Sequence, residues 1–551
     1  MRKEFNLLDE PWIQVITPSL ERKEMPLTET LVHSHKYTSL SGEMPTQDAA
    51  VLRVLLAIAV TIFYRYDENG RKEELSEENG SEFEDVLDRW QAYWDMGRFP
   101  EQAVSDYLET YRERFWLFHP ETPFWQVNDL QHGTDYSVEC LYGNMKESMN
   151  KATKHHFSMV DGSELSQLSY GEAVRWLIHL NAYAVNLKTD KKAPGPNQPV
   201  GIGRLGQLGF VMVNGKNLFQ ILMLNLCPLR GEEIWAPPKP AWEGGSRREQ
   251  GCEIAPPDNL PELYTIQSRR IMLKRDSQGR ITGFRALGGD FYTVEDDFNE
   301  PMTLWRLKAG KKKDDKKTYF PKKHDPAVHA WREFPTLLKK EEETRVPGIV
   351  QWMNILCEEK LIGSASLITF RMIGMVYGDQ MSYTYGDCVN DALAVSAGLL
   401  DDLGKVWVGS ICDEVYKCQA VAEKALEYFS GKMSRLLYGN SGSKGSIKRE
   451  LVSQYYFSID HAFREWLVQI DPAEDNREDK LIEWERQSFL HARKTVEEYV
   501  KTLNANIYRN RRVDEDLLTV PKILRDYQRA LFKIYSAWEG KSGTGEGKGN
   551  E

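Results

Sequence analysis

The stretch DKLIEWERQSFLHARKTVEEYVKTL, from Asp479 to Leu503, has the clearest helical pattern in this chain of 551 residues. Its apolar side chains recur at steps of three and four residues, at Phe489, Ala492, Val496, Tyr499, Val500 and Leu503. That spacing places them on one side of a helix, where they can pack against neighbouring helices. The stretch is therefore predicted to be one member of a helical bundle.

Three other long stretches have a helical pattern, and they are Asp402–Phe429, Lys448–Ile470 and Leu517–Trp538. Short connections separate successive helices, including a glycine- and serine-rich segment at 438–445 and a turn that contains Pro472. We therefore expect residues 396–540 to form a four-helix bundle. The last residues, 541–551, are glycine-rich and polar, and we expect them to be disordered.

The longer part of the chain, residues 1–395, mixes strand-like and helical patterns. Trp12–Thr17 and Phe210–Val213 indicate short strands, whereas Asp48–Tyr64 indicates a helix. The predicted fold class is α+β, with a large mixed α/β N-terminal domain followed by the bundle. The longest apolar run, Ala49–Phe63, is shorter than the roughly 20 residues that span a bilayer, and the N-terminus lacks a secretory signal. A cytoplasmic protein without a membrane partner is expected.

The formal net charge of −11 gives no general attraction to nucleic acid. The charge is uneven, because residues 67–88 carry −8 while the segment RLKAGKKKDDKKTYFPKK, at 306–323, carries +7. The basic segment is either a solvated surface loop or a loop that contacts phosphates through Lys311, Lys312 and Lys313. Seven scattered cysteines without a C-x-x-C pair predict neither disulfides nor a zinc site.

One glycine motif, GIGRLG at 201–206, matches the dinucleotide-binding pattern G-x-G-x-x-G. A loop precedes it and the strand-like Phe210–Val213 follows, with Asn214-Gly215 as an expected hairpin turn. Dinucleotide binding needs a strand before the motif and a helix opening inside it. We instead expect an exposed loop at 188–209 whose backbone approaches an anionic ligand. Its candidate phosphate contacts are Lys191, Lys192 and Arg204.

The sequence contains no H-E-x-x-H, G-x-S-x-G or G-x-x-x-x-G-K-[ST] motif, and no cysteine in a recognisable nucleophile context. A non-enzymatic protein without a cofactor or a metal is therefore expected. Tyr377–Ser382 indicates a compact hairpin turn between the apolar run Leu367–Val376 and the aromatic Tyr383–Tyr385.

Two motifs carry a family resemblance. FNLLDEPWI at 5–13 and FHPETPFWQ at 118–126 resemble, in the same order, signature elements of the large subunit (CasA) of the type I-E CRISPR Cascade surveillance complex. The glycine-bearing loop, the turn at 377–382 and the helical C-terminal part follow in order, so the resemblance covers nearly the whole chain.

The resemblance implies a non-catalytic subunit that recognises the protospacer-adjacent motif in double-stranded DNA from the minor groove. It implies that the subunit helps to open the duplex for guide pairing and recruits a helicase-nuclease. The implied partners are the other Cascade subunits, the guide RNA, the DNA target and the helicase-nuclease.

The resemblance also implies roles for particular residues. The segment from Ala193 to Gly195 matches the start of the family's glycine loop, which makes Gly195, Asn197 and Gln198 candidates for motif recognition. This chain has fewer glycines there than the family pattern. Amide donors of Asn197 and Gln198 would then meet minor-groove acceptors where the family uses bare backbone, which would change the preferred motif.

The turn at 378–382 resembles the family's glutamine wedge, so Gln380, with Met381 beside it, is the candidate that inserts below the motif and parts the first base pair. Phe157 resembles an aromatic residue that docks the subunit onto the RNA-bound assembly, and a core Phe is the alternative. Arg285 is the candidate for the family's lysine finger in the minor groove. The alternatives for that finger are Lys274 and Arg275.

Two other functions stay open. A helical adaptor that binds only proteins predicts that reversing the charge of the basic segment 306–323 leaves duplex binding and its salt dependence unchanged. An enzyme with a nucleotide cofactor at 201–206 predicts that dinucleotides stabilise the protein.

Overall fold

The computed structural model divides the chain into two units, each formed from more than one segment of the sequence. The first comprises Met1–Val328, Lys340–Met353 and Thr369–Ala392, and the second comprises His329–Lys339, Asn354–Ile368 and Leu393–Glu551. The second unit thus includes two short segments that precede the expected boundary at residue 396. The structure describes residues 3–142, 168–186, 190, 192–193, 201–245, 251–292, 300–307, 318–339, 345–378, 381, 384–401, 404–439, 444–504, 508, 510–513 and 516–535.

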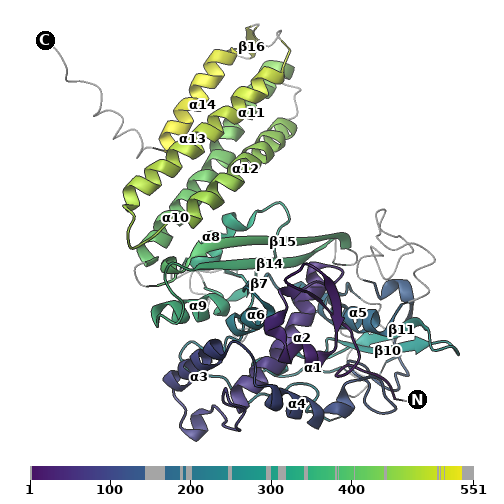
Figure 1. The fold of residues 1–551 in the computed structure, drawn as a ribbon. Coiled ribbons are helices and arrows are strands. Elements are labelled where there is room, and N and C mark those ends of the chain that lie inside the picture. The colour runs from purple at the N-terminus through teal and green to yellow at the C-terminus, as the bar shows by residue number, and fades with distance from the viewer. Residues whose placement is uncertain are drawn as a thin grey trace. The chain divides into compact units, whose positions relative to one another are not determined.

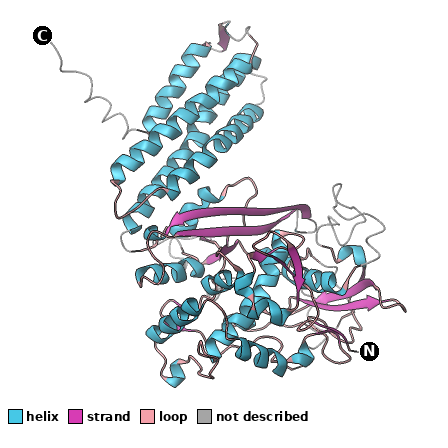
Figure 2. Cartoon of the chain, viewed as in Figure 1, coloured by secondary structure: helices cyan, strands magenta, loops and turns pink. Residues whose placement is uncertain are grey.

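Helices and short strands are interspersed along the described chain, so the predicted mixture of α and β structure is confirmed (Figures 1 and 2). The helices are α1 (Leu27–Val32), α2 (Pro45–Arg65), α3 (Phe83–Met96), α4 (Glu101–Thr110), α5 (Tyr170–Tyr183), α6 (Leu218–Leu224), α7 (Leu260–Tyr264), α8 (Phe334–Leu338), α9 (Gly348–Glu358), α10 (Gly404–Ala420), α11 (Leu426–Tyr438), α12 (Lys444–Val468), α13 (Arg477–Thr502) and α14 (Val520–Ile534). The strands are β1 (Glu4–Asn6), β2 (Ile13–Ile16), β3 (Arg22–Met25), β4 (Ser39–Leu40), β5 (Trp116–Phe118), β6 (Thr134–Ser137), β7 (Phe210–Val213), β8 (Leu229–Arg230), β9 (Glu233–Ile234), β10 (Arg269–Arg275), β11 (Ile281–Gly288), β12 (Trp305–Leu307), β13 (Tyr319–Pro321), β14 (Leu367–Tyr377), β15 (Thr384–Ser396), β16 (Arg511–Val513) and β17 (Asp516–Leu518).

Helix α2 forms much of the core of the first unit and packs against α5 and α7. By length and composition it could span a membrane, but 94% of its apolar window is buried inside the structure, so core packing accounts for its composition. The one charged residue in its apolar run, Arg53, is held by Glu300 through hydrogen bonds of 2.7 and 2.9 Å. The Arg53 guanidinium also lies 3.7 Å from the centre of the Tyr264 ring.

The two motifs behind the family resemblance lie side by side, because β1 pairs with β5 in antiparallel register. Their polar side chains bind backbone groups in the core. The indole N–H of Trp12 donates to the Leu7 carbonyl at 3.0 Å. The Gln126 amide donates to the Leu117 carbonyl at 2.7 Å and accepts from the Leu273 N–H at 2.9 Å. The Trp12 contact therefore orders the first motif internally, whereas Gln126 joins the second motif to the distant strand β10.

Strand β7 covers the predicted residues, but its partner lies far along the chain. The sheet order is β15-β14-β7, with Val213 opposite Phe370. The expected hairpin turn at Asn214-Gly215 is therefore wrong. The chain turns there into α6, which begins where the Asn217 side chain accepts the Gln220 N–H at 2.9 Å. An asparagine that caps a helix and one that makes a hairpin turn look alike in sequence.

Long helices dominate the second unit (Figure 1). Helix α10 continues through a π-helical turn, Val421–Ala425, into α11. The helix that was expected to end at Phe429 therefore extends to Tyr438, and Gly439 follows it with a φ of 66°. Glycine adopts a positive φ without strain, so the chain can leave the helix at this position.

Helix α13 matches the amphipathic stretch from which the bundle was predicted, and it packs against α12 and α10. Helix α14 begins at Val520 rather than at Leu517, because Leu517 belongs to β17 and Pro521 stands in the first turn of the helix. The buried side of α13 includes Phe489, Ala492, Val496, Tyr499 and Val500.

Candidate nucleic-acid interface

Helix α5 leads into the predicted glycine loop, and a capping box fixes its first turn. The Ser169 hydroxyl accepts the Glu172 N–H at 3.1 Å, and the Glu172 carboxylate accepts the Ser169 N–H at 2.8 Å. These side chains satisfy donors that a helix N-terminus leaves free. Every residue from Ala173 to Tyr183 is buried, so the loop starts from a firmly packed element.

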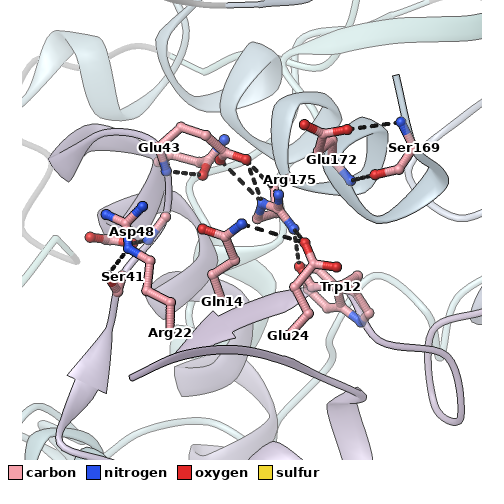
Figure 3. Close-up of polar contacts among 12 residues, drawn as sticks. Trp12, Gln14, Arg22, Glu24, Ser41, Glu43, Asp48, Ser169, Glu172 and Arg175 are labelled. Carbon is pink, nitrogen blue, oxygen red and sulfur yellow. Dashed lines mark hydrogen bonds and ion pairs between the residues drawn. The ribbon is translucent and has the colours of Figure 1, made fainter. Parts of the chain in front are cut away.

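A buried arginine joins α5 to the N-terminal strands (Figure 3). Arg175 Nη1 donates to the Trp12 carbonyl at 2.7 Å and to Glu24 at 2.6 Å, and Nε donates to Glu43 at 3.1 Å. The Arg175 side chain is only 1% exposed, and the two carboxylates compensate its charge. Separating a buried cation from its anions is costly, so these contacts hold α5 against the sheet β3-β2-β4.

The second stem of the glycine loop packs so closely that only glycine fits. The Gly203 N–H donates to the Ala184 carbonyl at 2.9 Å, and a Cβ at Gly203 would overlap the Ala182 backbone. A Cβ at Gly206 would overlap the hydroxyl of Tyr377. Gly206 lies in a single 3₁₀ turn, Leu205–Gln207, and strand β7 follows that turn. The GIGRLG motif therefore serves close packing and lacks the helix that a dinucleotide needs.

The strands β14 and β15 are neighbours in one sheet and flank the turn at 377–382, so the predicted hairpin is confirmed. The Tyr377 hydroxyl donates to the Tyr183 carbonyl at 2.7 Å, a contact between residues 194 positions apart. In the turn, the Met381 carbonyl accepts the Asn186 N–H at 3.2 Å. Met381 has a φ of 54° and is 41% exposed. The structure thus joins the predicted wedge turn to the first stem of the glycine loop.

Arg269, a buried residue of β10, holds both stems and was not among the residues predicted from the sequence. Its Nη2 donates to the Gly201 carbonyl and, at 3.4 Å, to the Ala184 carbonyl. Burial lowers the pKa of Arg269 to about 10, which still leaves it charged at neutral pH. Its strand, RRIMLKR, is rich in basic residues, and nothing in the sequence distinguishes the one that faces the stems.

The start of the glycine loop is also tied to the segment that precedes β6. The Asp190 carboxylate accepts the Gly133 N–H and the Lys192 N–H, each at 2.9 Å, and these backbone hydrogen bonds lower the pKa of Asp190. The Lys192 side chain is exposed, as a phosphate contact requires. Its role in DNA binding stays a prediction.

Arg204 lies inside the protein rather than on an exposed loop. It is 7% exposed, and its guanidinium is 4.4 Å from the centre of the Tyr292 ring. Its positive charge also contributes to lowering the pKa of the buried Glu300, after the larger contribution of Arg53. This burial contradicts the predicted phosphate contact at Arg204, because a backbone phosphate needs an accessible cation.

The three lysine-finger candidates all have acidic partners. Arg285 and Lys274 share Asp135, with shortest distances of 2.7 and 2.6 Å. Their hydrogen bonds, first that of Arg285, lower the pKa of Asp135 to about 2. Arg275 binds Glu4 at 2.6 Å. A minor-groove contact by any of them would require breaking an ion pair, and the assignment of Arg285 stays a prediction.

Among the residues that the structure describes, no group of three His, Cys, Asp or Glu side chains could hold a metal ion. The other predicted site residues and the C-terminal tail lie outside the described residues: Phe157, Lys191, Gly195, Asn197, Gln198, Lys311, Lys312, Lys313, Gln380 and 541–551.

Comparisons with known proteins agree with this architecture. The family model for CRISPR-associated protein Cse1 matches residues 6–495. CRISPR-associated protein CasA/Cse1 from Thermus thermophilus is 27% identical over 378 residues, which are 68% of each chain. The crystal structure of Thermobifida fusca Cse1 matches 97% of this chain and 99% of that chain, with a TM-score of 0.78 and 25% identity. A chain of a CRISPR RNA-guided surveillance complex matches 96% of this chain and all of that chain, with a TM-score of 0.67 and 18% identity. The chain therefore belongs to the Cse1 (CasA) family, as its two N-terminal motifs predicted.

Proposed function

We propose that this chain is the large, non-catalytic subunit of a type I-E CRISPR surveillance complex and assembles with guide RNA and the other Cascade subunits. Membership of the Cse1 family over residues 6–495 supports this role. The similarity in fold to a chain of an RNA-guided surveillance complex agrees with it.

Within that complex, the chain recognises the protospacer-adjacent motif through Gly195, Asn197 and Gln198. These residues approach the minor groove, whose donor and acceptor pattern is degenerate, so related motifs are tolerated. Gln380 then parts the first base pair. Unstacking that step costs roughly a few kcal/mol, which pairing with the guide RNA offsets. After pairing, the chain helps to recruit the helicase-nuclease.

The observation that carries this proposal is the attachment of the wedge turn to the glycine-loop stem. Tyr377 binds Tyr183, and Met381 binds Asn186, so the two segments are held at a set separation before DNA arrives. Preorganisation reduces the free energy that binding spends on ordering loops. A duplex held at the loop therefore meets the wedge at a defined base step.

The test uses an RNA-loaded complex prepared with and without this chain. Its binding is measured on duplexes that differ only in the base pairs beside the guide-matched region. Motif-dependent binding that requires the chain supports the proposal, and binding that is indifferent to the chain refutes it. Gly195→Val should weaken motif discrimination. Gly245→Val is the matched control, because an added Cβ at Gly245 would meet no atom within 4 Å.

One observation favours a second function, that of an adaptor which binds only proteins. Phe457 on α12 is 81% exposed, and Val406 and Leu490 are also exposed. A large aromatic side chain that is this exposed is available as an anchor for a protein partner. The adaptor function predicts that Phe457→Ser releases the chain from its complex, and that DNA binding by the remaining subunits keeps its motif preference.

A further inference from the structure

The basic segment 306–323 is carried by a β-hairpin of the first unit. Strand β12 pairs antiparallel with β13, with Trp305 opposite Pro321. The Lys322 N–H donates to the Leu304 carbonyl at 2.8 Å. The hairpin therefore fixes the backbone immediately before Lys323, whose side chain is exposed.

The amine of Lys323 reaches the predicted wedge turn. Its Nζ lies 3.6 Å from Met381 Sδ and 5.7 Å from the centre of the Tyr377 ring. A thioether is a weak acceptor and an aromatic face attracts a cation only modestly, so neither neutralises the charge. No carboxylate of the described chain contributes to the electrostatic environment of Lys323, where the one charged neighbour is Arg306. Among the residues that the structure describes, Lys323 is thus a cation without a compensating carboxylate beside the wedge turn.

We propose that Lys323 binds a phosphate of the DNA backbone next to the base pair that the wedge parts. The inference rests on the proposed function and names one contact of the same site. An ammonium group is a compact point charge that binds phosphate regardless of the neighbouring base. The contact should therefore hold the strand at the point of opening without changing which motif is preferred.

The surroundings of Lys323 also make this contact sensitive to pH. Lys323 is exposed as a residue, but its amine lies against Met381 and Tyr377 and loses part of its hydration there. This loss of hydration, followed by repulsion from Arg306, lowers the pKa of Lys323 to about 8. Burial raises the pKa of Tyr377 well above its ordinary value, so the facing phenol stays neutral. Met381 does not titrate.

A bound phosphate favours the protonated amine and raises its pKa, so DNA binding is coupled to proton uptake. Affinity is then highest below pH 8 and falls as the pH rises through that value. The protonated fraction of a group with this pKa falls about tenfold between pH 7 and pH 9, which sets the largest expected loss of affinity.

The test compares the wild-type complex with complexes that carry Lys323→Gln, Lys323→Arg or, as a matched control, Lys216→Gln. Lys216 is also exposed, and it lies three residues after Val213, the last residue of β7. Val213 pairs with Phe370 on β14. Phe370 and Tyr377 are seven residues apart on β14, or about 23 Å along the strand. The control therefore removes a lysine charge from the same unit at a distance from the wedge turn.

Affinity for a motif-bearing duplex is measured at 50 and 200 mM salt and at pH 7 and 9. Each phosphate contact accounts for an about 3.5-fold drop in affinity when the salt concentration rises from 50 to 200 mM. The drop in affinity measured for Lys323→Gln should therefore be about 3.5-fold smaller than that of the wild type. Lys323→Arg should keep the wild-type salt dependence and lose the pH dependence of this contact, because arginine stays charged. Lys216→Gln should match the wild type in both respects.

A Lys323→Gln complex with wild-type salt and pH dependence would overturn the phosphate contact, even where motif-dependent binding upholds the proposed function. A wild-type complex without motif-dependent binding overturns both. Thermal unfolding of each variant confirms that the substitution leaves the fold intact.

Discussion

Replacing Tyr377 with Phe should loosen the wedge hairpin from the glycine-loop stem while leaving the ring in place. The lost hydrogen bond is 2.7 Å long, and its acceptor belongs to Tyr183, which is 1% exposed. Leaving a buried acceptor without its partner costs about 1–2 kcal/mol. That free energy corresponds to a roughly 5- to 30-fold smaller population of the attached hairpin relative to the detached one.

Hydrogen exchange at Asn186 measures this detachment directly, because its N–H donates to Met381 in the turn. In Tyr377→Phe, a peptide that contains Asn186 should exchange faster by that factor. Tyr93→Phe is the matched control, since the Tyr93 hydroxyl also donates to a backbone carbonyl, that of Tyr66, at 3.1 Å. The control should leave exchange at Asn186 unchanged.

Unchanged exchange at Asn186 in Tyr377→Phe would refute the reasoning that this hydroxyl holds the hairpin. In the assembled complex, the same variant should bind a motif-bearing duplex nearly as well as the wild type and open it less efficiently. Strand opening is followed by the fluorescence of a base analogue placed at the first base pair. Equal losses of binding and opening would count against a positioning role for Tyr377.

Gln380→Ala should impair strand opening more than initial motif binding, and equal losses in the two assays would exclude a wedge. Arg53→Met should destabilise the protein by about 3–5 kcal/mol in urea denaturation, because it leaves Glu300 as a buried, unpaired charge; the double variant Arg53→Met/Glu300→Met should recover part of that loss. Burial raises the pKa of Glu414 in α10 to about 7 from an ordinary value of 4.5, so the folded state holds this proton more tightly than the unfolded state. The stability that Glu414 contributes is full below pH 4.5 and is lost as the pH rises through 7. Thermal unfolding, followed by helical circular dichroism, should therefore show a smaller decline in stability between pH 5 and pH 8 for Glu414→Gln than for the wild type.

The sequence by itself determined the features that depend on local pattern. The three- and four-residue spacing of apolar side chains predicted α13, and a turn between two apolar or aromatic runs predicted the hairpin β14–β15. The motifs at 5–13 and 118–126, together with the order of the segments that follow them, identified the family. Periodicity and turn chemistry act over a few neighbouring residues, so they can be recognised without knowing how the chain folds.

Only the tertiary structure decided which distant residues meet. It buried Arg204 against Tyr292, although Arg204 was predicted to lie on an exposed loop. It also selected Arg269 to hold both stems of the glycine loop. It also placed Tyr377 on the carbonyl of Tyr183. Such pairs form between segments that are far apart in the sequence, and these segments meet only when long loops close. Which side chains then touch depends on how the whole core packs, so local sequence patterns do not predict them.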